Sequence, residues 1–198
     1  MGKIASLRGT SKFGVRQITV IGMLSAISIM LGLSGFGFIP LPTAKATIMQ
    51  IPVIIGAILE GPLVGAMIGL IFGLFSIAQS ITTPNILSFA FINPLVSVLP
   101  RVLIGITTYY AYKWTVSNRE SVRIGLSAVV GSLTNTVGVL SMIYILYAAQ
   151  FAAVRGIEMG AAIKVIWSIA LVNGIPEAII AAAISVPVVG AIKKRYKN

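Results

Sequence analysis

The chain has 198 residues, of which 57% are hydrophobic and only 10% are charged, and its mean hydropathy is +1.00. A soluble domain carries roughly 25% charged residues, so this composition excludes an ordinary water-soluble fold. The net charge of +11 does not indicate nucleic-acid binding, because the basic residues stand in short clusters between apolar runs, as they do in the loops of membrane proteins.

The apolar runs predict an all-α integral membrane protein, a single domain (1–198) built as a bundle of six transmembrane helices. A helix needs about 20 apolar residues to cross the ~30 Å hydrocarbon core of a membrane. We expect the helices at residues 18–34, 48–59, 63–80, 94–114, 124–148 and 165–192. The second run contains Pro52 and is only ~18 Å long, too short to cross alone, so the backbone beside it must be buried in protein or line a cavity.

The basic residues predict which side of the membrane each loop occupies. Eleven Lys and Arg residues lie in the N-tail (1–17), the turn at residues 113–123 and the C-tail (193–198). Only three, Lys45, Arg155 and Lys164, lie in the opposite loops. Positive residues favour the cytoplasmic side. We therefore predict a multi-pass protein of the cell membrane with both termini in the cytoplasm.

Arg101 and Glu177 are the two charged residues placed inside apolar runs. A charge at membrane depth is costly, and it persists where it is paired or used. Asn173 lies one helical turn from Glu177 on the same face, and Asn135 lies at a similar depth in the fifth span. This set predicts a site for a polar small molecule, with the Arg101 guanidinium binding a carboxylate. The alternative is that Arg101 and Glu177 form an ion pair that only fixes helix packing.

Small residues recur at helical spacing in two of the predicted spans. Gly61, Gly65, Gly69 and Gly73 give the third span a smooth face, which lets another helix backbone approach closely. We expect this glycine row to pack within the chain. The shorter pair, Gly22-x-x-x-Ala26 in the first span, suits either packing within the chain or contact with a partner protein.

Several kinds of chemistry are excluded by missing residues. The sequence has no cysteine or histidine and only four acidic residues, which excludes disulfides, thiolate or imidazole metal sites and Ser-His catalysis. It also lacks a G-x-x-x-x-G-K-[ST] phosphate loop, so ATP-driven transport would need the ATPase of another chain. We predict no enzyme activity, no metal site and no cofactor.

Taken together, these features resemble the substrate-binding subunits (S components) of energy-coupling factor (ECF) vitamin transporters. The resemblance covers essentially the whole chain and includes the six spans and the short second helix. Three stretches carry it further: Ile39-Pro-Leu-Pro-Thr-Ala-Lys-Ala-Thr-Ile-Met-Gln-Ile-Pro-Val, Leu99-Pro-Arg-Val-Leu-Ile-Gly105 and Val172-Asn-Gly-Ile-Pro-Glu-Ala178.

The resemblance implies a vitamin captured from outside, between the last three helices (94–192) and the first loop. Helices one to three (18–80) would face a membrane-embedded coupling subunit that rests on two cytoplasmic ATPases, and the subunit would topple in the membrane to release its cargo. Where the family has A-x-x-x-A on the first helix, this chain has Gly22-Met-Leu-Ser-Ala26. The substrate-binding residues then expected are Arg101, Asn135, Asn173, Glu177, Thr43, Lys45 and Asn93.

Among vitamins, the stretches around Arg101 and Glu177 look most like the pantothenate group. One arginine suits one carboxylate, and pantothenate carries one carboxylate with hydroxyls and an amide. Folate or another vitamin is the second choice. A stand-alone small-solute carrier and a structural membrane subunit are alternatives of a different class.

Overall fold

The computed structural model describes residues 14–40, 45–84 and 87–197. The order of elements is α1 (Val15–Ser34), β1 (Phe38–Pro40), β2 (Lys45–Thr47), α2 (Ile51–Glu60), α3 (Pro62–Thr82), α4 (Ser88–Phe91), α5 (Pro94–Ser97), α6 (Leu99–Trp114), α7 (Glu120–Arg155) and α8 (Met159–Lys197). Strands β1 and β2 pair antiparallel as a small hairpin, which the sequence analysis did not predict.

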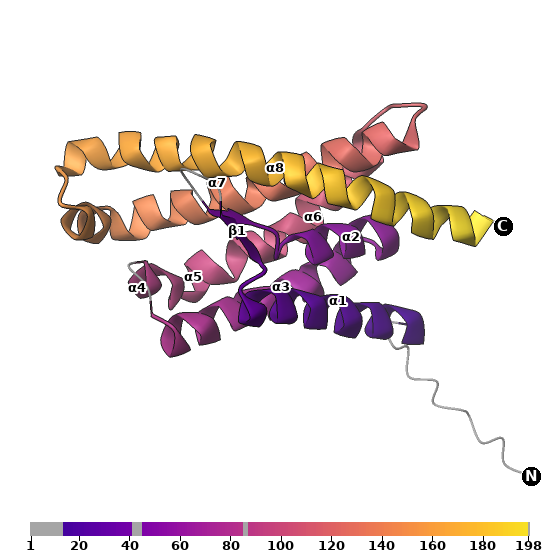
Figure 1. Ribbon diagram of the computed structural model, residues 1–198, viewed down its shortest axis with the longest axis horizontal. Coiled ribbons are helices and arrows are strands. Elements are labelled where there is room, and N and C mark those ends of the chain that lie inside the picture. Colours follow the sequence, from indigo (N-terminus) through magenta and orange to yellow (C-terminus); the bar gives the residue numbers. More distant parts are fainter. Residues whose placement is uncertain (1–13, 41–44, 85–86, 198) are drawn as a thin grey trace, which may run out of the picture.

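The helices confirm the predicted all-α membrane fold. Five stretches are long and apolar enough to cross a membrane: α1, α3, α5 with α6, α7, and α8. The remaining predicted span, the short second one, corresponds to α2, which has ten residues. Figure 1 shows these helices running roughly along one axis, with the start of α1 and the end of α8 at the same end of the bundle.

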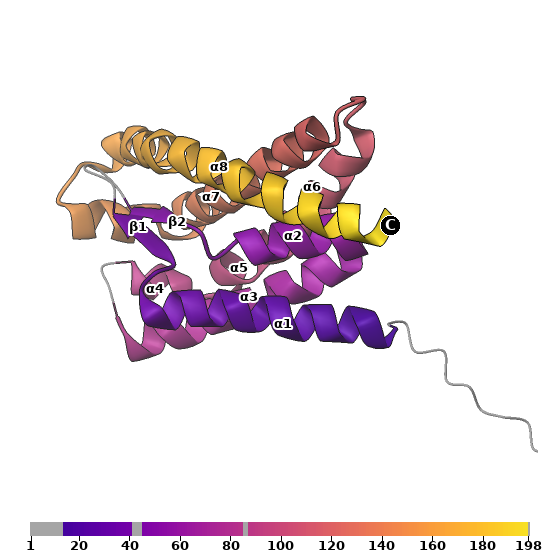
Figure 2. The ribbon, with the colours of Figure 1, turned by 45° about the vertical axis from the view of Figure 1, so that its right-hand side comes forward.

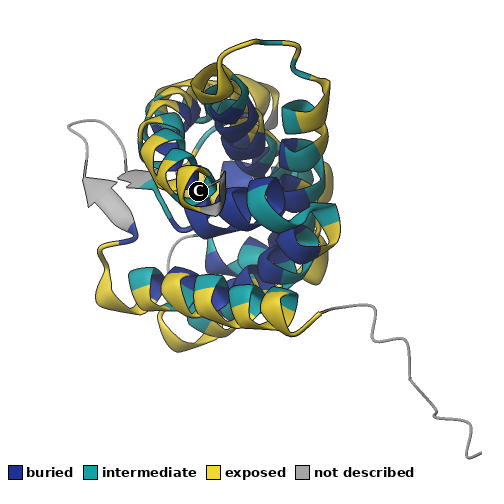
Figure 3. Cartoon of the chain, turned by 90° about the vertical axis from the view of Figure 1, so that its right-hand side faces the viewer, coloured by how far each residue is buried: buried dark blue, intermediate teal, exposed yellow. Residues whose placement is uncertain are grey.

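The short helix α2 occupies the middle of the bundle, between α1 and α8 in Figure 2. Eight of its ten residues are buried, including Val53 and Ile54 at 0% exposure. It begins beside Pro52 and ends at Gly61, whose φ of 103° favours glycine, and Pro62 then begins α3. A helix that is apolar all round is surrounded either by protein or by the hydrocarbon of a membrane. Protein surrounds α2, and Figure 3 shows the buried residues gathered in the centre of the bundle.

Three glycines of the predicted row pack within the chain, whereas a Cβ on the fourth, Gly61 between α2 and α3, would meet nothing within 4 Å. A Cβ on Gly65 would lie 2.9 Å from the Cα of Gly105 in α6, and a Cβ on Gly69 would lie 2.1 Å from the carbonyl oxygen of Arg101. Gly73 faces Val98 in the same way, at 2.7 Å from its Cα. The backbones of α3 and α6 therefore touch, which only glycine permits.

Helices α7 and α8 are longer than predicted, and the polar loop expected between them is mostly helical. Only residues 156–158 are non-helical there. The helix α7 continues past a kink at Tyr147 because Phe151 and Ala152 are buried against Ala162 and Ile166 of α8. Packing of apolar side chains outweighs the local polarity that suggested a loop. Arg155 and Lys164 consequently lie in helices.

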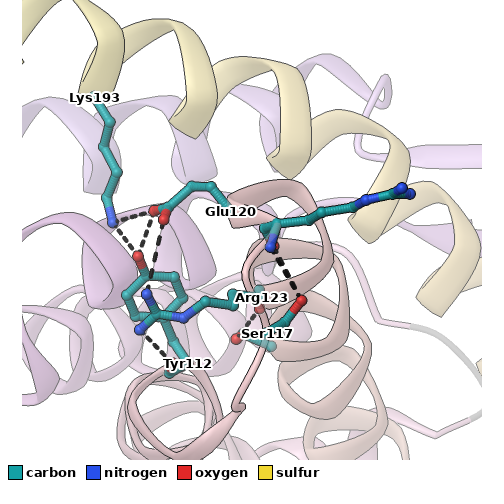
Figure 4. A network of polar contacts seen from close by, with 7 residues as sticks. Tyr112, Ser117, Glu120, Arg123 and Lys193 are labelled. Carbon is teal, nitrogen blue, oxygen red and sulfur yellow. Dashed lines mark hydrogen bonds and ion pairs between the residues drawn. The ribbon is translucent and has the colours of Figure 1, made fainter.

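A polar cluster ties α6, α7 and α8 together at the end of the bundle that carries both chain ends (Figure 4). The ammonium group of Lys193 donates to the carboxylate of Glu120 at 2.8 Å and to the hydroxyl of Tyr112. Arg123 donates to the backbone carbonyl of Tyr112 at 3.1 Å. Because these side chains come from three helices, they hold this end of the bundle together as one unit.

Candidate binding site

A cavity of about 250 Å³ lies between α3, α6, α7, α8 and the end of the hairpin. Of the predicted site residues, Arg101, Asn135, Asn173 and Glu177 all line it. These four come from three helices and are separated by up to 76 positions in sequence, so the tertiary fold brings them together. Its other polar lining residues are Thr47, Ser76, Gln79, Ser80 and Thr136.

Arg101 is buried in the wall of this cavity, with 6% of its surface exposed. Its Nη1 donates to the carbonyl oxygen of Val96 at 2.8 Å, across the break between α5 and α6. The guanidinium carbon lies 5.6 Å from the ring centroid of Phe72 and 5.3 Å from that of Phe91. Its Nε has no hydrogen-bond partner among the described residues. A buried guanidinium with unused donors is suited to bind a carboxylate.

Glu177 accepts hydrogen bonds from two different parts of the chain. Its Oε1 accepts from the backbone amide of Thr47 at 2.9 Å, and its Oε2 accepts from the hydroxyl of Thr136 at 2.8 Å. The first bond fastens the end of the hairpin to α8. Among the described residues, the ion pairs do not include one between Arg101 and Glu177.

The two asparagines add amide groups to the same wall. Asn135 is 8% exposed, and its Oδ1 has no partner among the described residues. Asn173 is half-buried and lines the cavity from α8, one turn from Glu177. An unpaired buried amide oxygen is costly, so a ligand hydroxyl or N–H that reached Asn135 would relieve that cost.

The third helix contributes residues that the sequence analysis missed. Ser76, Gln79 and Ser80 line the cavity from α3, opposite the last three helices. The division into helices 1–3 for coupling and helices 4–6 for substrate is therefore not strict. Gln79 also donates to the carbonyl oxygen of Gly32 in α1 at 3.1 Å. Their spacing of three and four residues puts them on one helical face, and this polar stripe in an apolar span was the available signal.

Asn93, another predicted binding residue, is not among the described residues that line the cavity. Asn93 caps α5: its Oδ1 accepts from the amide of Leu95 at 2.9 Å, and its Nδ2 donates to the hydroxyl of Tyr147 at 3.0 Å. Thr43 lies outside the described residues, and only the backbone of Lys45 is described, in β2.

The predicted partner-contact residues, Gly22 and Ala26, are exposed on α1. A Cβ on Gly22 would meet nothing within 4 Å. The pair therefore does not pack within the described part of the chain. Large neighbours on the same helix are exposed as well, including Met23 at 62% and Met30 at 68%.

A polar cavity enclosed by the helices of a membrane bundle defines a membrane-embedded subunit that binds a small molecule. The comparison with known families agrees, because residues 16–189 match the family described as "ECF transporter, substrate-specific component". The chain belongs to this family of non-enzymatic transporter subunits, as the sequence analysis predicted. Membership implies in general a vitamin as substrate and the energy-coupling module as partner.

Two relatives carry more specific names. The chain is 33% identical to the "Pantothenic acid transporter PanT" of Lactococcus lactis subsp. cremoris (strain MG1363), over 80% of this chain and 83% of that protein. It is 38% identical to the "Pantothenate transporter PanT" of Leuconostoc mesenteroides subsp. mesenteroides, over 52% of this chain and 55% of that protein.

Proposed function

We propose that this chain is the pantothenate-binding subunit of an ECF uptake transporter. The observation that carries the proposal is Arg101, a buried guanidinium with unused donors beside a polar cavity. The names of both relatives support the same substrate. A cavity of about 250 Å³ is at the small end of ligand pockets, which favours a compact vitamin over the larger folate.

In the proposed complex, the carboxylate of pantothenate binds Arg101, whose guanidinium carbon lies 5.6 Å from the ring centroid of Phe72 and 5.3 Å from that of Phe91. The hydroxyls and the amide of the vitamin bind Asn135, Asn173 and Glu177. The Oδ1 of Asn135 has no partner among the described residues, so a vitamin group that donates to it would satisfy a buried polar atom, which is how a buried polar site gains selectivity.

The partners in this proposal are a membrane-embedded coupling subunit and two cytoplasmic ATPases. Exposed small residues on α1 support a contact there, because Gly22 and Ala26 let a partner helix approach closely. The bundle would sit in the cell membrane with both termini in the cytoplasm, so that the cavity, at the opposite end from the chain termini, receives the vitamin from outside.

Titration of pantothenate into the detergent-purified protein tests the substrate. We expect saturable binding, and we expect Arg101→Ala to weaken it by 2–5 kcal/mol or so, roughly 30-fold or more, because the vitamin carboxylate loses the guanidinium that binds it. Arg101→Lys should weaken binding less, since lysine keeps the charge but not the two-pronged geometry.

The melting temperature of each ligand-free variant is the control, because Arg101 also bonds Val96. Wild-type affinity in a well-folded Arg101→Ala protein would remove Arg101 from the site. Binding of folate but not pantothenate, measured in the same titration, would reassign the substrate.

A further inference from the structure

A second cavity, of about 240 Å³, lies on the outer side of α7 and α8. All of its lining residues come from these two helices, and Leu140 separates it from the first cavity. Its walls are mainly aliphatic, with Val137 and Ile145 from α7 and Ile166 from α8. It is therefore a groove between two membrane-crossing helices, open on the side away from the rest of the bundle.

The surface around this groove is exposed although it is apolar. Ile145 is 68% exposed and Trp167 is 57% exposed. Exposed apolar side chains on helices that cross a membrane face hydrocarbon tails, which are as apolar as they are. The side chains that line a groove in such a surface lose van der Waals contacts unless another molecule fills the groove. A flexible acyl chain has the shape and the chemistry to do so.

Amphipathic and basic residues mark one end of the groove. Tyr144 and Trp167 line it, and both residue types favour the level of the lipid headgroups. Lys164 is exposed one turn beyond Trp167, toward the start of α8. Arg155, at the end of α7, lies over the ring of Phe151, which packs in the same cluster as Ile166. With Glu158 in the connection between them, this end keeps one positive charge in excess.

We propose that the groove binds one acyl chain of an anionic phospholipid, whose phosphate lies against Lys164 and Arg155. The acyl chain lies along the apolar groove, and the two cations at the end of the groove bind the phosphate. This site is separate from the vitamin cavity, and the proposal stands whether or not the vitamin is pantothenate.

The two tryptophans of the chain make the proposal testable by fluorescence. The variant Trp114→Phe leaves Trp167 as the only tryptophan, at the groove itself. This protein is reconstituted into phosphatidylcholine vesicles that contain small fractions of either brominated phosphatidylglycerol or brominated phosphatidylcholine, since bromine quenches a neighbouring indole. We expect half-maximal quenching of Trp167 at a fraction of brominated phosphatidylglycerol roughly fivefold or more lower than that of brominated phosphatidylcholine.

Two changes in the Trp114→Phe background separate the acyl chain from the headgroup. Ala170→Leu fills the groove and should reduce quenching by either lipid, whereas Ala183→Leu, at an exposed alanine of α8 outside the groove, should leave quenching unchanged. Arg155→Gln with Lys164→Gln should remove the preference for phosphatidylglycerol. Equal quenching by the two lipids in the Trp114→Phe protein would overturn the proposal. A preference for phosphatidylglycerol that is changed neither by Ala170→Leu nor by Arg155→Gln with Lys164→Gln would overturn it as well. Absence of quenching by either brominated lipid would show that no acyl chain occupies the groove and would overturn it too.

Discussion

Glu177 connects the hairpin, α7 and α8 through a single carboxylate, which makes it as much a structural residue as a binding one. Thr47 and Thr136 both donate to it. Arg101 has a similar double position, since it holds the junction of α5 and α6 through Val96 while its other donors stay unused. At both residues the proposed vitamin site and the local fold share the same side chain, so a test of binding must also measure stability.

Substitution of Glu177 by Gln should leave the melting temperature of the ligand-free protein near that of the wild type. The amide oxygen still accepts from Thr47, and the amide nitrogen donates to Thr136, whose hydroxyl turns toward the carbonyl oxygen of Ser132 at 3.3 Å. Pantothenate should still raise the melting temperature of this variant.

Glu177→Ala is the contrasting variant, because it leaves the amide of Thr47 without its partner. We expect it to lower the free energy of unfolding by ~2–3 kcal/mol, the cost of losing hydrogen bonds to a charged group. Differential scanning fluorimetry of both variants measures the difference. Equal destabilisation by Gln and Ala would show that the negative charge itself is needed, as in an ion pair with Arg101.

At the scale of elements, α1 and α3 differ in how extensively they pack against the rest of the chain. The helix α3 is packed against α6 with backbone contact along its glycine row, and the same α6 segment carries Arg101. The helix α1 has few buried residues, Ser25, Ser28 and Gly32. A packed α3 suits a helix that lines the binding cavity, and an exposed α1 suits a helix that meets a partner.

The contact between α3 and α6 predicts that Gly69→Ala destabilises the protein. The new methyl group would lie 2.1 Å from the carbonyl oxygen of Arg101, and backbone cannot yield as a side chain can. Overpacking of this kind costs ~1–3 kcal/mol. Gly22→Ala, where a methyl group meets nothing within 4 Å, is the matched control and should melt as the wild type does. A fully stable Gly69→Ala protein would contradict the close approach of the two helices.

The exposed face of α1 predicts that Ala26→Leu abolishes uptake and leaves pantothenate binding intact. The bulky side chain would keep a partner helix at a distance, while the cavity lies on the other side of the bundle. Uptake of labelled pantothenate by cells measures the first effect, and titration of the purified variant measures the second. Ala183→Leu on α8 is the control that adds the same side chain elsewhere. Unchanged uptake in Ala26→Leu would mean that this face meets only lipid.

For the whole molecule, the bundle places the start of α1 and the end of α8 at one end, and α4 and the connection from α7 to α8 at the other (Figure 1). Basic side chains follow the same division. Arg119, Arg123 and Lys193 lie at the end with the termini, whereas the opposite end has Arg155 and Lys164. The asymmetry favours the first end as cytoplasmic.

Cysteine labelling tests this orientation without background, because the chain has no cysteine of its own. Ser117→Cys, in the connection between α6 and α7, and Lys3→Cys, outside the described residues, should resist an impermeant thiol reagent in whole cells. Thr83→Cys, just after α3, should react. Labelling of Ser117→Cys from outside, with protection of Thr83→Cys, would invert the topology.

The membrane class, the apolar membrane helices and the two intramembrane charges follow from the sequence, because hydropathy and the cost of burying a charge act locally. The close packing at Gly65, Gly69 and Gly73 followed as well, since small residues at this spacing let helix backbones approach each other. The sequence could not place Ser76 and Gln79 opposite Arg101, nor show that Glu177 meets Thr47 across 130 positions, because such contacts depend on how helices pack. The helical end of α7 was missed for the same reason: Phe151 is buried only once α8 folds back over it.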